Sequence, residues 1–346
     1  MKRVGYLYEK LCDKALIEKA IREASKGKTK RAYVRKVLAN TDYYVDQLYE
    51  MFVSRNVKLT IPRERTIFDN SSLKERHIKI PRFFPDQIIH WCVILITYPI
   101  MQKGMYQYCC GSVPKKGGIV GKRYLEKCLR RDKSLKYCLK LDIHKFFPSC
   151  NKNCMMGMFE RKIKDREFLA LIEQILDNGD EGLPIGFYTS QWFSNFYLER
   201  LDHFIKEKER TKVYIRYVDD MTLLDTNKRK LHKTLIKIRD FLATIRLRLK
   251  ENYQVWKLDS RPIDFLGYRF FRGFTQLRKR IYYRICRRLS RIKDYITVSQ
   301  ARGILSLLGW LQQIDNNLYR KTKELKSMLA IIVSNYDRRK LNYGNI

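Results

Sequence analysis

The chain has 346 residues, of which 72 are Lys or Arg and 36 are Asp or Glu, so its formal net charge is +36. With 45% hydrophobic residues it has enough apolar side chains to bury a core, which excludes general disorder. So large a positive charge repels itself unless a polyanion neutralises it, and nucleic acid is the expected partner. An anionic membrane surface or a ribosome-associated structural role is the alternative. The length suggests two or three domains.

No membrane-spanning or exported protein is expected. The longest apolar stretch, Ile88 to Met101, contains His90 and Thr97 and is too short to cross a bilayer. The first residues open no apolar run of signal-peptide length. The nine cysteines include no Cys-x-x-Cys, and the five histidines show no zinc spacing. We therefore expect an intracellular protein whose cysteines are mostly small buried residues.

The predicted elements, in chain order, mix helices and strands and end in a basic helical tail. Such an order is typical of an α+β core with an appended helical domain. The individual predictions are helices over 1–58, a mixed region over 60–125 with a flexible basic loop at 111–118, a strand over 135–147, a helix over 190–208, two strands over 213–224, a helix over 228–248, a strand pair over 263–271 and three helices over 276–340.

Two adjacent carboxylates, Asp219 and Asp220, stand between the strand-like runs 213–218 and 221–224. A solvated hairpin tip is the ordinary place for such a pair, because Asp is a common turn residue. The apolar, β-favouring flanks favour a buried hairpin instead. Buried adjacent carboxylates repel each other unless a cation lies between them, and their hard oxygen ligands suit Mg²⁺.

A third carboxylate, Asp142, follows the apolar run 139–141. Alone, it is best explained as a turn or helix-start residue. Together with Asp219 in a very basic chain, it suggests a two-metal site. Ions bound there would activate a primer 3′-hydroxyl and stabilise the departing pyrophosphate.

Four segments in this order resemble the motifs of reverse transcriptases, and the resemblance covers roughly residues 60–320. Residues 141–147 (Leu-Asp-Ile-His-Lys-Phe-Phe) resemble the first palm motif of that family, and residues 182–198 resemble the second. Residues 217–220 (Tyr-Val-Asp-Asp) resemble the third, and residues 265–268 (Phe-Leu-Gly-Tyr) the primer-grip hairpin.

The resemblance implies an α+β, right-hand polymerase fold with an antiparallel palm sheet and a helical basic thumb. The expected domains are N-terminal helices and fingers over 1–134, a palm over 135–272 and a thumb over 273–346. The implied activity is RNA-directed DNA polymerisation with two Mg²⁺ ions, which Mn²⁺ can replace. The implied catalytic and metal site is Asp142, Ile143, Asp219 and Asp220, and the implied primer grip is Phe265, Leu266 and Gly267.

Phe147 matches the family position whose bulky ring excludes a ribose 2′-hydroxyl, which implies a preference for deoxynucleotides. A plain core aromatic is the alternative. Lys116, in the basic loop at 114–123, is nearest to the family's phosphate-binding Arg, and Lys79 and Arg82 are second candidates. Any one of these cations is more often a solvated surface charge.

The second motif departs from the common family pattern, because this chain has Ile185-Gly186 and Ser190-Gln191 where Gln-Gly and Ser-Pro are usual. With residues 249–255 and 308–311, this departure resembles the enzymes of diversity-generating retroelements, which are bacterial or phage-encoded. Those enzymes copy a template-repeat RNA into cDNA with errors at adenines, and they work with a small, basic, pentameric accessory protein. Ile185 removes a polar group near the incoming nucleotide, so discrimination should weaken. The alternative is that Ile185 only packs beneath the loop.

Two further regions qualify this interpretation. Where many relatives carry a Lys pair, this chain has Asn252-Tyr253 between Lys250 and Lys257, so no general acid is assigned. Residues 278–293 predict an amphipathic helix whose basic face favours contact with a template–primer duplex. Trp310 is expected to anchor the helical core.

The alternative functions are a retron, defence-system or group II intron reverse transcriptase, an RNA-dependent RNA polymerase, which the aromatic Phe147 disfavours, and a non-catalytic RNA-binding scaffold.

Overall fold

The structure is a computed structural model that describes residues 2–69, 74–179, 181–292, 296–314, 320 and 322–342. The chain divides into two compact units. The first comprises residues 1–117, 139–223 and 229–254, and the second comprises residues 118–138, 224–228 and 255–346. The expected boundaries near residues 134 and 272 stay predictions.

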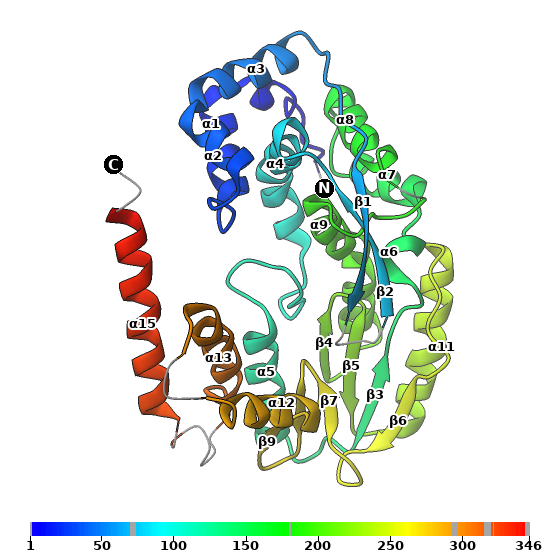
Figure 1. Ribbon diagram of the computed structural model, residues 1–346. Helices are drawn as coiled ribbons and strands as arrows, with labels where there is room; N and C mark the ends of the chain where they lie inside the picture. The colour runs from blue at the N-terminus through cyan, green and yellow to red at the C-terminus, as the bar shows by residue number, and fades with distance from the viewer. Residues whose placement is uncertain are drawn as a thin grey trace. The chain divides into compact units, whose positions relative to one another are not determined.

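Helices dominate the N-terminal part of the first unit, as the sequence predicts (Figure 1). The Asp13 side chain caps the first long helix by accepting the N–H of Ala15 at 2.9 Å. The apolar helix α4 packs against α1 and against α9, which lies later in the chain. These elements are η1 Glu9–Cys12, α1 Lys14–Ser25, α2 Ala32–Ala39, α3 Thr41–Val53, η2 Phe83–Gln87 and α4 Ile88–Gly104.

The apolar segment around α4 is longer than the sequence predicts. Phe83–Gly104 spans 22 residues and is long and apolar enough to cross a membrane by length and composition alone, the one such helix among the described residues. Of its most apolar window, 56% is buried inside the protein, as expected of a helix in a core. The reason for the longer span is that the π-helix η2 continues directly into α4.

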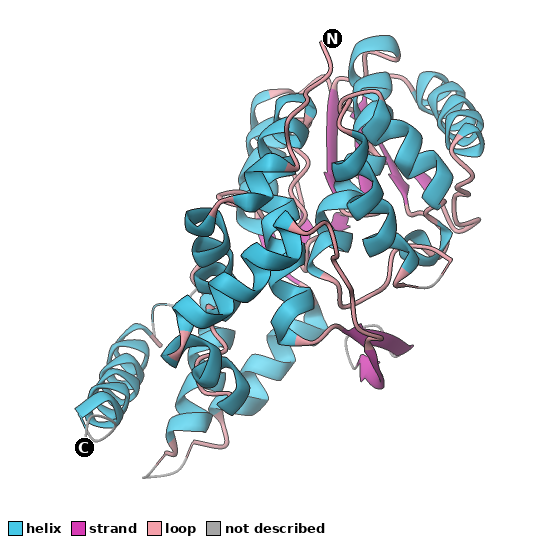
Figure 2. Cartoon of the chain, turned by 90° about the horizontal axis from the view of Figure 1, so that it is seen from above, coloured by secondary structure: helices cyan, strands magenta, loops and turns pink. Residues whose placement is uncertain are grey.

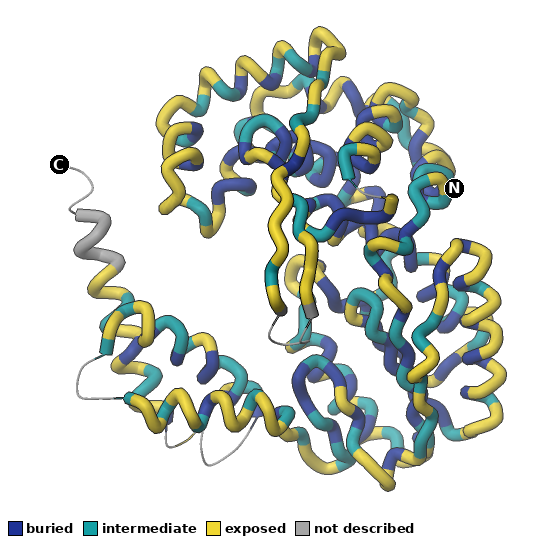
Figure 3. The backbone as a smooth tube through the Cα atoms, turned by 45° about the vertical axis from the view of Figure 1, so that its right-hand side comes forward, coloured by how far each residue is buried: buried dark blue, intermediate teal, exposed yellow. Residues whose placement is uncertain are grey.

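A two-stranded antiparallel ribbon follows α3. Strand β1 (Arg63–Asp69) pairs with β2 (Lys74–Ile80), with Arg63 opposite Ile80. Most of its described residues are exposed, as Figure 3 shows. The ribbon is therefore held by its backbone pairing more than by a buried face.

A four-stranded sheet carries the acidic motifs, in the order β4-β5-β3-β6. The predicted strand over 135–147 is shorter in the structure, because the chain leaves the sheet at Asp142 and enters the short helix α6. The single helix predicted over 190–208 is three pieces. The elements are β3 Tyr137–Leu141, α6 Phe146–Ser149, α7 Lys152–Glu160, α8 Arg166–Asp177, α9 Tyr188–Tyr197, α10 Glu199–His203, η3 Phe204–Lys208, β4 Val213–Tyr217, β5 Asp220–Asp225, α11 Lys228–Thr244 and β6 Gln254–Lys257.

The second unit combines a three-stranded antiparallel sheet, order β7-β8-β9, with helices. Helix α5 begins at Gly118, inside the segment predicted as a loop. The elements are α5 Gly118–Arg131, β7 Ile263–Phe265, β8 Tyr268–Phe270, β9 Thr275–Leu277, α12 Lys279–Leu289, α13 Val298–Leu311 and α15 Lys323–Asn342. Of the basic helix predicted over 278–293, Lys293 lies outside the described residues. Figure 2 shows the mixture of helices and strands that defines the predicted α+β class.

Candidate active site

The three predicted carboxylates come from adjoining strands of the four-stranded sheet. Asp142 directly follows β3, Asp219 lies in the two-residue turn between β4 and β5, and Asp220 begins β5. Because β3 and β5 are neighbours in the sheet, residues far apart in sequence meet at one place. The structure therefore brings Asp142, Asp219 and Asp220 together.

Burial and mutual repulsion leave the two carboxyl groups of the turn easier to protonate than usual. Burial, together with the neighbouring Asp142 carboxylate, raises the pKa of Asp219 to about 6. Burial likewise raises the pKa of Asp220 to about 6, although the Lys140 ammonium opposes that shift. Such shifts indicate a site that gains from an added cation.

Two lysines that the sequence did not point to provide part of the compensating charge. Lys140, on β3, places its Nζ 3.2 Å from Oδ2 of Asp220. Lys250 places its Nζ 2.5 Å from Oδ2 of Asp142, and its backbone N–H donates to the Asp142 carbonyl oxygen at 2.8 Å. An isolated β-bridge between Ile143 and Leu249 fixes this alignment. Lys250 could be noticed in the sequence only as a flank of Asn252-Tyr253.

Two carboxylate oxygens of this group remain without a donor. Oδ1 of Asp142 and Oδ1 of Asp220 are both buried and have no hydrogen-bond partner in the part of the chain that the structure describes. Such an atom is costly unless a cation or donor reaches it. Among the described residues no three His, Cys, Asp or Glu side chains are arranged as a ready metal-binding group. Carboxylate oxygens are nevertheless the ligands that a hard divalent cation prefers. A cation bound here would replace the Lys140 and Lys250 ammonium groups at Asp220 and Asp142.

Phe147 lies against the start of the second motif. The Leu183 N–H donates to the Phe147 carbonyl oxygen at 2.8 Å, and a Cβ added at Gly182 would lie 2.4 Å from that oxygen. The Phe147 ring is partly exposed and packs edge-on against Phe146, with ring centroids 5.6 Å apart. The first and second motifs are thus joined through backbone contacts, and Phe147 remains partly exposed beside them.

Ile185 and Gly186 contact the end of the β1–β2 ribbon. The Lys79 N–H donates to the Ile185 carbonyl oxygen at 2.8 Å. Gly186 has a φ of +117°, and a Cβ there would lie only 2.2 Å from the Lys79 carbonyl oxygen, so this position requires glycine. Ser190 and Gln191, the other two predicted residues of this motif, lie on α9. The Ser190 hydroxyl is buried without a partner among the described residues, and Gln191 is exposed.

The other predicted ligands have ordinary contacts, and their roles stay predictions. Lys79 Nζ lies 3.4 Å from Oε1 of Glu64. Lys116 donates to the Tyr106 carbonyl oxygen at 3.4 Å, and the exposed Arg82 donates its backbone N–H to Asp86.

The predicted primer-grip residues lie in the second unit. Phe265 pairs with Tyr268, and Leu266 and Gly267 form the two-residue turn with φ values of +54° and +84°. Trp310 packs on this hairpin, with its ring centroid 5.5 Å from that of Tyr268. The expected role of Trp310 in the helical core stays a prediction, because the contact found here is with the hairpin.

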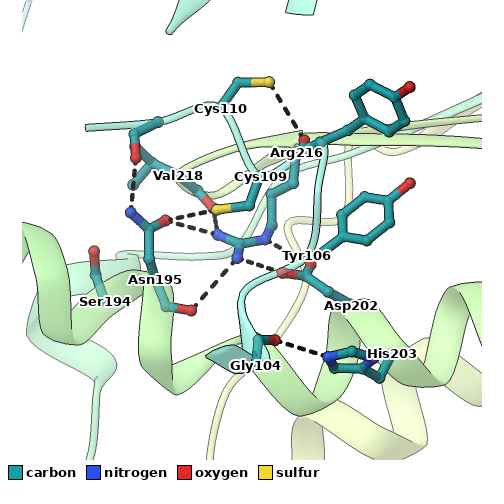
Figure 4. A network of polar contacts seen from close by, with 12 residues as sticks. Gly104, Tyr106, Cys109, Cys110, Ser194, Asn195, Asp202, His203, Arg216 and Val218 are labelled. Atoms are coloured by element: carbon teal, nitrogen blue, oxygen red, sulfur yellow. Dashed lines mark hydrogen bonds and ion pairs between the residues drawn. The ribbon is translucent and has the colours of Figure 1, made fainter. Parts of the chain in front are cut away.

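A buried ion pair beside the Asp219 turn escaped the sequence analysis. Arg216, on β4, contacts Asp202 of α10 and Asn195 of α9 (Figure 4). The signal was present, because an Arg within the apolar run 213–218 requires a partner. The partner itself could not be identified from sequence.

Comparison with known proteins agrees with the motifs. Residues 100–270 match the reverse transcriptase (RNA-dependent DNA polymerase) family. The retron Ec73 reverse transcriptase of Escherichia coli is 32% identical over 121 residues, which are 31% of this chain and 38% of that protein. The retron Ec86 reverse transcriptase of Escherichia coli is 31% identical over 111 residues, 32% of this chain and 33% of that protein. The matched part thus spans under two fifths of either relative.

Solved structures support the fold. Telomerase from Candida tropicalis in complex with a TWJ fragment of telomeric RNA has a TM-score of 0.51 and 12% identity, covering 86% of this chain and 57% of that one. Apo telomerase from Candida tropicalis has a TM-score of 0.50 and 12% identity, covering 88% of this chain and 63% of that one. At such low identity the likeness shows the fold alone, and it confirms the predicted α+β polymerase fold. Residues 100–270 of this chain are therefore similar in sequence to the reverse transcriptase family, and the chain shares its fold with telomerase.

Proposed function

We propose that the protein is an RNA-directed DNA polymerase. The observation that carries the proposal is the meeting of Asp142 with Asp219 and Asp220, where two buried carboxylate oxygens have no partner among the described residues. A family domain over residues 100–270 and a net charge of +36 support it, since both a template and a growing strand are polyanions.

The residues of the site have different roles in the proposed reaction. Asp142, Asp219 and Asp220 would hold Mg²⁺, with Mn²⁺ as a substitute, and the bound ions would activate the primer hydroxyl and stabilise the leaving pyrophosphate. Lys140 and Lys250 hold two carboxylates in place by ion pairs. Phe147 would exclude a ribose 2′-hydroxyl and so select deoxynucleotides.

Primer extension on an RNA template with Mg²⁺ and dNTPs tests this proposal. We expect extension by the wild type and none by the Asp219→Ala plus Asp220→Ala variant. Asp177→Asn is a suitable control, because Asp177 is an exposed partner of Lys152 at the end of α8 and lies outside the four motifs. Extension that survives the double substitution would refute the catalytic assignment.

Two kinds of genetic element are candidates for the enzyme's source. Relatives at 32% and 31% identity are retron reverse transcriptases, which favours a retron. Ile185-Gly186 and Ser190-Gln191 favour a diversity-generating retroelement, with a template-repeat RNA and a small, basic, pentameric accessory protein. Ile185 supports the second candidate because its partly buried side chain offers no hydrogen bond to a nucleotide.

Sequencing of the cDNA distinguishes the two. A diversity-generating enzyme should make errors concentrated opposite template adenines, and Ile185→Gln should lower them by supplying a polar group. A retron enzyme should show no such concentration. Because Ile185 contacts Lys79 through its carbonyl oxygen, the substitution leaves that backbone contact in place. An unchanged error spectrum in the Ile185→Gln variant would dismiss the role of this residue in fidelity.

A further inference from the structure

Arg216 is a fully buried cation with a complete set of partners. Its side chain has 0% exposure, and its Nε and Nη2 donate to the two carboxylate oxygens of Asp202 at 2.7 and 2.5 Å. The Tyr214 hydroxyl donates to the same carboxylate at 2.6 Å. Asp202 is 1% exposed, so the pair is shielded from solvent on both sides. Figure 4 shows the guanidinium group between the helix that carries Asn195 and strand β4, which carries Arg216 itself.

The remaining nitrogen of Arg216 reaches the turn that holds the catalytic carboxylates. Nη1 donates to the Val218 carbonyl oxygen at 2.8 Å and to Asn195 Oδ1 at 3.1 Å. Asp219 follows Val218 directly, so this hydrogen bond fixes the peptide group that links Val218 to Asp219. The buried pair with Asp202 thus fixes the position of a donor aimed at the turn.

The turn needs such a bond because its backbone is strained. Val218 has a φ of +58°, the left-handed region that favours glycine and that a β-branched residue rarely occupies. In a two-residue hairpin turn, positive φ at the first central position usually calls for glycine. A valine there persists only where neighbouring groups hold it.

The opposite side of the turn is closed by residues 108–111. Arg216 pairs through its backbone with this segment, since its N–H donates to Tyr108 and its carbonyl oxygen accepts from Cys110. A Cβ added at Gly111 would lie 2.7 Å from the Val218 backbone nitrogen. Asn195 Nδ2 donates to the Gly111 carbonyl oxygen at 2.7 Å, so Asn195 links both sides.

We propose that Arg216, oriented by Asp202 and Asn195, is a positioning residue that holds Val218 in its left-handed conformation and thereby places Asp219 opposite Asp142. The inference deepens the proposed polymerase function, and its activity measurements rest on that function. Arg216 itself touches no substrate, because it is completely buried.

A double-mutant cycle between Arg216→Lys and Val218→Gly tests the proposal. Lysine keeps the charge beside Asp202 but lacks the fork that reaches Val218. We expect Arg216→Lys to lower kcat for single-nucleotide addition by about 10- to 100-fold, as small misplacements at a reacting centre do, with little change in the KM for dNTP. In the Val218→Gly background the same substitution should cost much less, because glycine adopts positive φ without help.

Hydrogen exchange of residues 217–221 gives a second measurement that needs no activity. Arg216→Lys should speed it, and Asn195→Ala should do so more mildly without leaving a buried charge unpaired. Leu235→Ala, a buried core truncation on α11, serves as the control that lowers stability without touching the turn.

The outcomes separate the two proposals. If Arg216→Lys costs the same factor in both backgrounds, or exchange at the turn changes no more than in Leu235→Ala, Arg216 is merely a core residue. If the wild type extends no primer, the polymerase proposal fails, while faster exchange in Arg216→Lys still supports a hold on the turn. If Arg216→Lys does not fold, the exchange of the Asn195→Ala variant decides.

Discussion

Lys250 and Asp142 are joined by both their backbones and their side chains, although 108 residues separate them in sequence. The N–H of Lys250 donates to the Asp142 carbonyl oxygen at 2.8 Å, while its Nζ lies 2.5 Å from Oδ2. A lysine therefore occupies one oxygen of a carboxylate that we propose as a metal ligand. Its ammonium group would compete with such a metal, and in the metal-free protein it holds the carboxylate in place.

Replacing Lys250 by Met should change how the protein responds to Mg²⁺. About a third of each side chain is exposed, so the ion pair contributes about 1 kcal/mol or less to folding. Without metal, we expect a lower melting temperature, because Asp142 then repels Asp219 uncompensated. Added Mg²⁺ should stabilise the variant more than the wild type, since no ammonium competes. Thermal melts across a Mg²⁺ titration measure this, with Lys257→Met as the control. Equal metal stabilisation in both proteins would contradict competition.

The stability of the metal-free protein should rise as the pH falls from about 7.5 to about 5. Asp219 and Asp220 have pKa values of about 6 in the folded chain, above the usual value of about 3.9. The folded state therefore binds more protons than the unfolded state between these values, and acidification favours folding there. Urea denaturation in EDTA at several pH values measures the gain. Asp219→Asn plus Asp220→Asn should remove most of it, and a gain that persists in this variant must come from other groups.

Phe147→Ala should admit ribonucleotides. Its ring is partly exposed, and its backbone contact with Leu183 does not depend on the side chain, so the local fold should persist. We expect the efficiency ratio of rNTP to dNTP incorporation to rise by about 10- to 100-fold, the usual effect of removing a steric contact in a binding pocket. Single-nucleotide kinetics with matched rNTP and dNTP pairs measure the ratio. Phe68→Ala, an exposed aromatic on β1, should leave it unchanged.

Gly186→Ala should weaken the link between the second motif and the β1–β2 ribbon. The added Cβ would meet the Lys79 carbonyl oxygen at 2.2 Å and would require an unfavourable φ of +117°. We expect a loss of about 1–3 kcal/mol in unfolding free energy and a higher KM for dNTP. Gly157→Ala is the matched control, because a Cβ there meets no atom within 4 Å. Equal effects of the two substitutions would exclude a specific contact at Gly186.

The exposed cations of α12 should account for part of the salt dependence of nucleic-acid binding. Arg284 and Arg287 lie on the exposed face of this helix, opposite the buried Ile285. Replacing both with Ala should reduce the slope of log K against log salt concentration by up to about 2 for an RNA–DNA duplex. Fluorescence anisotropy over a salt series measures the slope. The same double change at Arg229 and Lys233 of α11 should reduce it less if α12 faces the duplex.

Local sequence patterns determined several features of this protein. The apolar, β-favouring character of residues 213–224 predicted the hairpin, and Asp219-Asp220 fell at its turn as expected. The periodicity of the N-terminal 58 residues and of the tail predicted their helices. Propensity and period act over a few residues, so a single sequence contains them in full. The helix predicted over 190–208 is three consecutive pieces in the structure, and local periodicity did not predict these breaks.

Only the tertiary structure decided which charges meet. Nothing in the sequence pairs Lys250 with Asp142, Lys140 with Asp220, or Arg216 with Asp202, because these contacts depend on strand order and chain path. Burial then gives them their weight, since a charge removed from water must find a partner wherever the fold provides one. The sequence alone thus determined the acidic motifs of the proposed active site, while the three-dimensional packing determined what holds them in place.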